Sequence, residues 1–327
     1  MTETSVTDQW SPALRFQSLS TLPSLGIIRV SGPEAESFLS AQFTNDLRAL
    51  SESRSQLGAW CNAQGRVLAV FRVLRDEASY VLLLPQEMIG STIERLKKFV
   101  LRAKLTIEEA SEGVLAAFGP QTDLAARLPA IPEHDDAVAH RAGVSVVRVP
   151  GTLPRWLFIG ASESLAVPRL QESVADLSDT AWQLQDILAG IPSVGTATTG
   201  AFLPQMLNLD ALGGVSFTKG CYPGQEVIAR LRYRGQLKRR MYLALVEDTA
   251  APRAGDPVYP HADRGTQPAG QIVAAAPRDS GRFALLAVVD NEAARAGSIH
   301  LRHPDGPVLS FQRLPYPLDD TGVSHPA

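Results

Sequence analysis

Short strand-like segments recur along most of the chain, and this pattern constrains the fold more than any other feature of the sequence. The segments are rich in apolar and β-branched residues and are separated by turn-forming residues such as Gln64-Gly65. Helical spacing and capping residues predict helices between them, at residues 34–42, 85–100 and 181–189. We expect strands at residues 25–30, 57–61, 66–75, 80–84, 105–109, 114–118, 144–149 and 156–159.

The helix expected at residues 85–100 has a clear amphipathic pattern. Its apolar residues recur at helical spacing and share one face: Met88, Ile89, Ile93, Leu96, Phe99 and Val100. This pattern predicts a helix that packs one side against the protein core.

The pattern of predicted secondary structure changes near Met241. After it, short strands at residues 242–246, 271–274, 283–289 and 308–312 alternate with proline and glycine turns, which is typical of a small all-β domain. A chain of 327 residues is long enough for two or three domains. Residues 130–143, which include Asp135 and Asp136, are predicted to form an exposed loop. We expect a loosely held N-terminal arm at residues 1–24, a second region at residues 25–236 and a C-terminal domain at residues 237–327.

The composition limits the classes of protein that the chain can represent. Hydrophobic residues make up 45% and charged residues 20%, and the net charge of −3 does not predict a general nucleic-acid or membrane binder. The two cysteines, Cys61 and Cys221, are too few for a disulfide framework and fit a reducing compartment. The N-terminus lacks the pattern of a signal peptide, and no apolar run is long enough to span a membrane. We therefore expect a cytoplasmic protein without membrane contact.

Residues 217–230 form the segment with the most pronounced chemical character. Pro223 suits the start of a helix, which places Glu226 in the first turn of that helix. A carboxylate at such a position is favoured by the helix dipole. At Gly220 and Gly224 the backbone can approach a ligand closely or adopt a positive φ.

Cys221 lies just before this expected helix and two residues after Lys219. A helix N-terminus and a nearby ammonium group both favour a thiolate over a thiol, so the position suits a reactive sulfur. The chemistry alone equally permits a small buried apolar residue, as free cysteines commonly are. Cys61, by contrast, lies in a strand pattern beside Trp60, where we expect a core residue.

Several segments resemble a known family. The run Lys-Gly-Cys-Tyr-Pro-Gly-Gln-Glu, from Lys219 to Glu226, is similar to the signature of YgfZ-type proteins, which are relatives of the glycine-cleavage T protein. Residues 38–46, 64–68 and 203–210 resemble the same family, as does the block from residue 237 onward. The resemblance covers most of the chain.

The resemblance implies a T-protein-like α+β fold. In this fold, two intertwined α+β units and a C-terminal β-barrel form a three-domain ring around a central channel. The channel is the folate site in the family, so the implied cofactor is tetrahydrofolate, a reduced folate. The implied folate contacts are Lys219, Gly220, Cys221, Tyr222, Gln225, Glu226 and Arg230.

The resemblance also implies a cellular role. Proteins of this family support the assembly or repair of iron–sulfur proteins, including iron–sulfur enzymes that modify tRNA. The implied partners are these enzymes or their assembly factors. The implied catalytic residues are Cys221 and Lys219.

One departure from the T protein bears on catalysis. The Gly-Gly-x-x-Asp-Asp stretch of that protein corresponds to residues 65–70 here, and Ala69 and Val70 replace its two carboxylates. Neither side chain can exchange a proton, so we expect no true aminomethyltransferase activity. Whether the chain is an enzyme stays open. The alternatives are a folate-dependent one-carbon transferase or demethylase, and a non-catalytic adaptor.

Two polar clusters have spacings that could suit a metal ion or an anion, but both are better explained as surface residues. His300 and His303, with Asp305, lack a third strong ligand nearby, so we expect a surface pair and no metal site.

A basic stretch follows Cys221 in the chain. It can hold an anion such as a folate polyglutamate tail, or it can make a weak contact with RNA. We favour a solvated surface face over an RNA contact for this stretch. The members of this basic stretch are Arg230, Arg232, Arg234, Lys238, Arg239 and Arg240.

Overall fold

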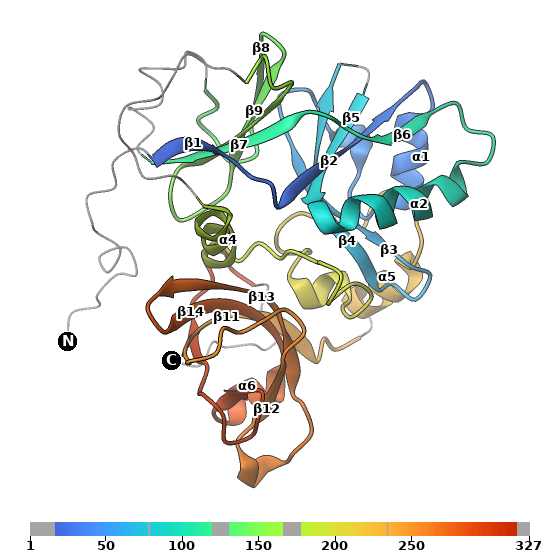
Figure 1. Cartoon of the computed structure of the whole chain (residues 1–327). Coiled ribbons are helices and arrows are strands. Elements are labelled where there is room, and N and C mark those ends of the chain that lie inside the picture. The colour runs from blue at the N-terminus through green and yellow to red at the C-terminus, as the bar shows by residue number, and fades with distance from the viewer. Residues whose placement is uncertain (1–16, 78, 120–130, 166–177, 234, 319–327) are drawn as a thin grey trace.

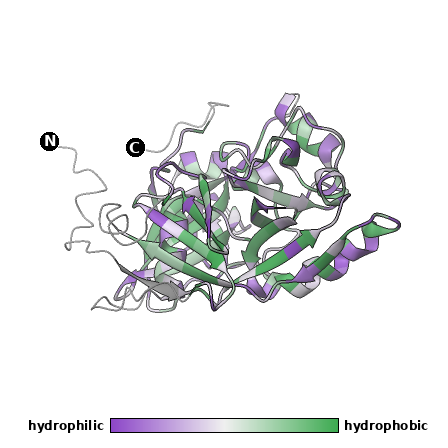
Figure 2. Cartoon of the chain, turned by 90° about the horizontal axis from the view of Figure 1, so that it is seen from above, coloured by the Kyte–Doolittle hydropathy of each residue, from purple (hydrophilic) through white to green (hydrophobic). Residues whose placement is uncertain are grey.

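The computed structural model describes residues 17–77, 79–119, 131–165, 178–233 and 235–318. Within these ranges the strands form three antiparallel sheets, and helices pack beside them (Figure 1). Figure 2 shows the hydrophobic residues concentrated in the strands, which supply most of the core. Short 3-10 helices connect some of the elements: η2 (Leu47–Ala49), η3 (Gln86–Met88), η4 (Pro204–Leu207) and η5 (Ala262–Arg264).

The first sheet has the strand order β3-β4-β5-β2-β6. Helices α1 (Ala35–Gln42) and α2 (Ile89–Val100) pack against it, and Leu39, Phe71 and Leu96 lie in one buried cluster. These elements confirm the helices and strands predicted for this part of the chain, although their ends differ by a few residues. The strands are β2 (Leu25–Ser31), β3 (Gln56–Cys61), β4 (Val67–Asp76), β5 (Ser79–Pro85) and β6 (Thr106–Glu109).

The second sheet shows two expectations to be wrong. Its strands, in the order β1-β7-β10-β9-β8, are β1 (Gln17–Thr21), β7 (Gly113–Phe118), β8 (Val138–Arg141), β9 (Val144–Val149) and β10 (Arg155–Gly160). β1 pairs with β7, so residues 17–21 are not part of a loose arm, and residues 1–16 lie outside the described residues. β8 pairs with β9, so residues 138–141 are a strand and not an exposed loop. Asp136, just before β8, binds the buried guanidinium of Arg72 at 2.5 Å.

The third sheet has the order β15-β12-β13-β14-β11-β16 and curls into a half-barrel (Figure 1). Its strands all follow residue 237. β11 (Arg239–Glu247) and β14 (Arg282–Asp290) pair along their full lengths. The structure confirms the strands expected here and adds two more and a short helix. The other elements are β12 (Pro257–Pro260), β13 (Gly270–Asp279), β15 (Ile299–Leu301), β16 (Ser310–Gln312) and α6 (Asn291–Ala296).

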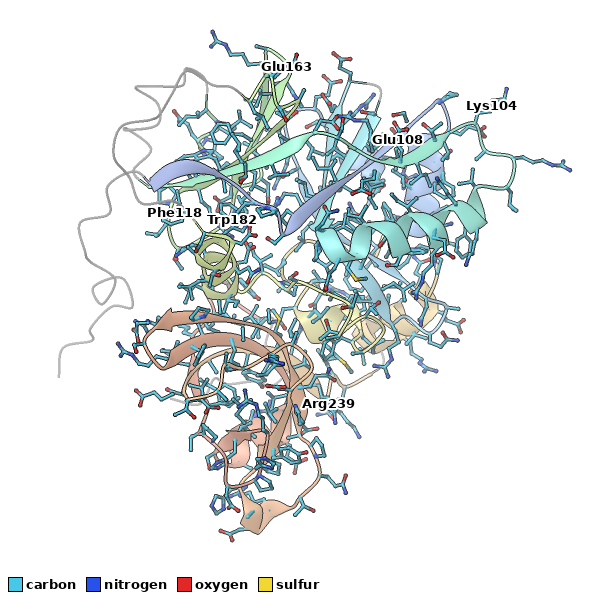
Figure 3. The ribbon with its side chains drawn as sticks, viewed as in Figure 1. Lys104, Glu108, Phe118, Glu163, Trp182 and Arg239 are labelled. Atoms are coloured by element: carbon cyan, nitrogen blue, oxygen red, sulfur yellow. The ribbon has the colours of Figure 1, made fainter. Side chains whose placement is uncertain are left out.

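Helix α4 (Asp179–Leu188) packs between the second and third sheets. Trp182 and Phe118 lie close together in the core of the second sheet (Figure 3). Ile187, on the same helix, lies in a buried cluster with Leu286 of β14. A helix from the region before residue 237 thus shares a core with the C-terminal sheet, and the domain boundaries stay a prediction.

Candidate functional site

The segment around Cys221 lies against the turn between β3 and β4. Gly224, with φ +80°, packs on Gly65, with φ +74°, and a Cβ on Gly224 would lie 2.5 Å from the Cα of Gly65. Gly224 therefore has to be glycine, since a side chain would clash and the positive φ would be strained. Helix α5 (Gln225–Tyr233) starts directly after it, two residues later than the start predicted at Pro223, because a positive φ cannot belong to a right-handed helix.

Lys219 is buried, and its ammonium group binds the end of helix α1. Nζ donates hydrogen bonds to the backbone carbonyls of Ser40, Phe43 and Asn45 at 2.5, 2.7 and 2.8 Å. These bonds use all three donors of the ammonium group. The last carbonyls of a helix lack intrahelical partners and carry partial negative charge, so a cation is favoured there. Burial lowers the pKa of Lys219 to about 8, which leaves the ammonium form dominant at neutral pH.

We call this set of bonds the Lys219 clamp, and it changes the role expected for the residue. The spacing predicted an ammonium group beside the Cys221 sulfur, where it would favour the thiolate. The hydrogen bonds of Nζ point instead to α1, and among the described residues no hydrogen bond or ion pair joins Lys219 to Cys221. Nζ also lies 5.2 Å from the ring centroid of Tyr222, a cation–π contact. The clamp positions the cysteine loop, and a catalytic role of Lys219 stays a prediction.

Cys221 is an exposed free thiol between two buried residues. Lys219 and Tyr222 are buried on either side of it, whereas Gly220 and Cys221 are exposed. The Tyr222 hydroxyl is buried without a partner among the described residues, and burial raises the pKa of this phenol. The interpretation of Cys221 as a buried apolar residue is therefore wrong. The loop is anchored at both ends and presents its sulfur to solvent.

Cys61 is the opposite case. It lies on β3, is 1% exposed and belongs to the same buried cluster as Tyr222. Burial raises the pKa of this thiol, so the thiolate is disfavoured. The prediction of a core residue is confirmed.

Cys221 is expected to react with iodoacetamide at least about tenfold faster than Cys61 in the native protein, because alkylation requires access to the sulfur. Mass spectrometry of the alkylated peptides over time measures both rates. In urea the two rates should converge, which controls for differences in peptide detection. Faster labelling of Cys61 in the native protein would contradict the arrangement described here.

The other predicted folate contacts come shortly after Cys221 in the sequence, on helix α5. Gln225 is partly buried and its Nε2 donates to the Lys219 carbonyl at 3.5 Å. Glu226 and Arg230 are exposed on α5 and lie four residues apart, hence on the same face of the helix. Their side chains are accessible to a ligand from solvent.

The basic stretch divides into exposed and buried members. Arg240 is buried, binds the carboxylate of Asp210 at 2.6 and 3.0 Å and donates to the Gln205 carbonyl, so it is a core ion pair and not part of a basic surface. The guanidinium of Arg232 lies 4.3 Å from the ring centroid of Phe217. The exposed members are Arg230, Arg232, Lys238 and Arg239, and Arg234 lies outside the described residues. Figure 3 labels Arg239, at the start of β11.

The prediction that both histidines lie at the surface is wrong for His300. His300 is buried, and its ring nitrogens bond to the Ser298 hydroxyl at 3.0 Å and the Gly306 carbonyl at 2.8 Å, whereas His303 is exposed. His300 lies on the short strand β15, whose three residues are all buried. In the described ranges, no group of three His, Cys, Asp or Glu residues is placed to hold a metal ion. No helix in these ranges is long and apolar enough to span a membrane.

Sequence reasoning missed the partner side of the Lys219 clamp. Thr44 joins the same contact, since its hydroxyl donates to the Gly214 carbonyl at 2.6 Å and its own carbonyl accepts the N–H of Ser216 at 2.8 Å. Residues 38–46 resemble the family in sequence. Nothing in their local pattern indicated that residues 40–45 receive the cysteine loop.

The fold is shared with a protein of glycine cleavage. The glycine cleavage system aminomethyltransferase T from Bartonella henselae matches with a TM-score of 0.71 and 18% identity, covering 92% of this chain and 86% of that one. This match confirms the predicted T-protein-like α+β fold. Fold and site together define a protein of the T-protein fold class that has an exposed cysteine loop.

Sequence similarity narrows the class. The chain is 32% identical to tRNA-modifying protein YgfZ from Colwellia psychrerythraea, over 91% of this chain and 92% of that protein. It is also 32% identical to tRNA-modifying protein YgfZ from Photobacterium profundum, over 93% of this chain and 92% of that protein. No protein-family model matches the chain. The chain belongs to the YgfZ family, as its Lys-Gly-Cys signature predicted.

Proposed function

We propose that this protein binds a reduced folate in the cytoplasm and supports the assembly or repair of iron–sulfur proteins, including iron–sulfur enzymes that modify tRNA. The observation that carries the proposal is the exposed thiol of Cys221, held between the buried Lys219 and Tyr222. Membership of the family supports it, because the similar proteins are named tRNA-modifying protein YgfZ.

A positioned and accessible thiol suits such a role chemically. A cysteine sulfur can attack an electrophile, bind a metal ion or exchange with a disulfide. Each of these reactions needs access from solvent, which Cys221 has and Cys61 lacks. The Lys219 clamp keeps the sulfur in a defined place relative to the rest of the site.

Exposed residues on α5, the helix that follows the cysteine loop, fit a reduced folate. A pterin carries N–H donors that a carboxylate such as Glu226 can accept, and a glutamate tail carries carboxylates that Arg230 can bind. Beside them, a Cβ added to Gly220 would have no neighbour within 4 Å. When bound, a reduced folate supplies a carrier for one-carbon units. Ala69 and Val70 are buried and cannot exchange protons, so the proposed activity differs from aminomethyl transfer.

Arg230→Ala is expected to weaken the binding of polyglutamylated tetrahydrofolate about tenfold or more, because a hydrogen bond to a charged group contributes roughly 1.5–3 kcal/mol. The monoglutamate should lose less, since it has fewer carboxylates for the arginine to bind. Isothermal titration calorimetry with both forms measures the two affinities. Arg253→Ala removes another exposed arginine, outside the site, and should bind as the wild type does.

The two parts of this prediction fail separately. If the wild-type protein binds neither form of tetrahydrofolate, the folate proposal is refuted. If it binds both and Arg230→Ala changes nothing, only the assignment of Arg230 to the glutamate tail is wrong.

A further inference from the structure

The C-terminal end of α2 exposes two large apolar side chains. Leu101 is 90% exposed and Phe99 is 50% exposed. The amphipathic pattern predicted Phe99 on the buried face, but its ring packs edge-to-face on Trp60, with centroids 6.2 Å apart, and half of the side chain faces solvent. Exposed apolar side chains that lie together mark a candidate interaction surface.

Positive charge is concentrated around these two side chains, in a segment that we call the α2 tip (residues 95–104). Its basic residues, all of them exposed, are Arg95, Lys97, Lys98, Arg102 and Lys104. Glu94, which precedes the tip, pairs with Lys98 at 3.1 Å. The other four basic side chains make no ion pair within the part of the chain that the structure describes. The tip is thus strongly positive in a chain whose net charge is −3.

Backbone contacts anchor the end of the α2 tip. Leu101 has φ +45° and ψ −97°, which is unfavourable for a leucine. The Lys104 N–H donates to the Glu34 carboxylate at 2.7 Å, and Gly32 packs so closely that a Cβ there would lie 2.5 Å from the Lys104 carbonyl oxygen. Strained residues of this kind persist where the surrounding structure holds them, and they cluster at functional sites. Figure 3 shows Lys104 at the outer edge of the molecule, away from the half-barrel.

We propose that the α2 tip binds a single-stranded segment of RNA. Exposed lysine and arginine side chains attract the phosphate backbone, and a half-exposed aromatic ring offers a surface on which a base can stack. The tip combines both features at Phe99 and its basic neighbours. An acidic protein surface would also match the charge, so a protein partner is one outcome of the test below. The inference does not depend on the binding of folate.

Fluorescence anisotropy with a short fluorescein-labelled oligouridylate tests the proposal on the full chain. Arg95→Glu combined with Arg102→Glu is expected to weaken binding at least about tenfold and to reduce its salt dependence, because phosphate contacts carry that dependence. Phe99→Ala is expected to weaken binding about fivefold or more without changing the salt dependence, since it removes stacking and no charge.

Two further double variants serve as controls. Arg253→Glu with Arg264→Glu makes the same change of charge on exposed arginines of the C-terminal part and should bind as the wild type does. Arg232→Glu with Arg239→Glu reverses charge in the basic stretch that follows Cys221. Tetrahydrofolate binding should be unchanged in the α2 tip variants, which separates this proposal from the folate proposal.

Several results would overturn the proposal. The wild-type protein could fail to bind the oligouridylate, or the two control variants could lose as much affinity as the α2 tip variant. Loss of binding in the Arg232 and Arg239 variant alone would assign RNA to the basic stretch instead. Tighter binding of polyglutamate than of the oligouridylate at equal charge concentration would show a site for acidic polypeptides, and a protein partner would then replace RNA.

Discussion

Cys221→Ala is expected to leave the fold intact and to abolish the cellular function. The residue is exposed, so loss of one sulfur atom should change the free energy of unfolding by less than about 1 kcal/mol. Alanine is neither a nucleophile, a metal ligand nor a redox partner, so every mechanism that uses the thiol stops at once. The assay is complementation of a bacterial strain that lacks its own YgfZ-type protein, with an iron–sulfur enzyme activity or the dependent tRNA thiolation as the readout.

The matched control is Cys61→Ala. Cys61 is buried in the core, so its truncation should lower the free energy of unfolding by about 1 kcal/mol or more while the folded fraction keeps its function. Thermal melts of both purified variants accompany the complementation test. A Cys221→Ala protein that melts normally and complements fully would show that the proposed role of this thiol is wrong.

Lys219→Ala is expected to destabilise the protein by about 3 kcal/mol, because it leaves three carbonyls of the clamp without their buried partner. Lys219→Met keeps most of the apolar stem and removes the donors, so its loss should be smaller, about 2 kcal/mol. Urea unfolding measures both differences. Lys238→Ala removes an exposed lysine from the same region and should stay within about 0.5 kcal/mol of the wild type.

A second readout distinguishes a clamp from an activator of the thiol. If Lys219 acts only by positioning, the pH profile of Cys221 alkylation in Lys219→Met should match that of the wild type. A profile displaced to higher pH, with normal stability, would restore the thiolate-activating role that the sequence spacing predicted. Unchanged stability of Lys219→Ala would show that the clamp contributes little.

Local patterns were sufficient for most of the regular elements. β4 and β5 carry runs of apolar residues that include β-branched valines, and such runs form strands wherever a sheet can bury them. β1 and β8 escaped prediction because neither carries a long run of apolar residues, and pairing with β7 and β9 stabilises them more than their own composition does. Phe99 followed the helical period, but its contact with Trp60 leaves half of the side chain exposed, so the period alone misjudged its burial.

The sequence by itself determined the strand pattern, the signature around Cys221 and the burial of Cys61, because each depends on residues that are close together in the chain. Only the tertiary structure decided how Lys219 is used. Spacing placed its ammonium group near a sulfur two residues away, yet the carbonyls that it binds lie 174 to 179 positions earlier. A buried ammonium group requires acceptors, and the end of α1 offers carbonyls that no helical N–H can reach. Lys219 binds these carbonyls, and Cys221, two residues further along the loop, is left exposed to solvent.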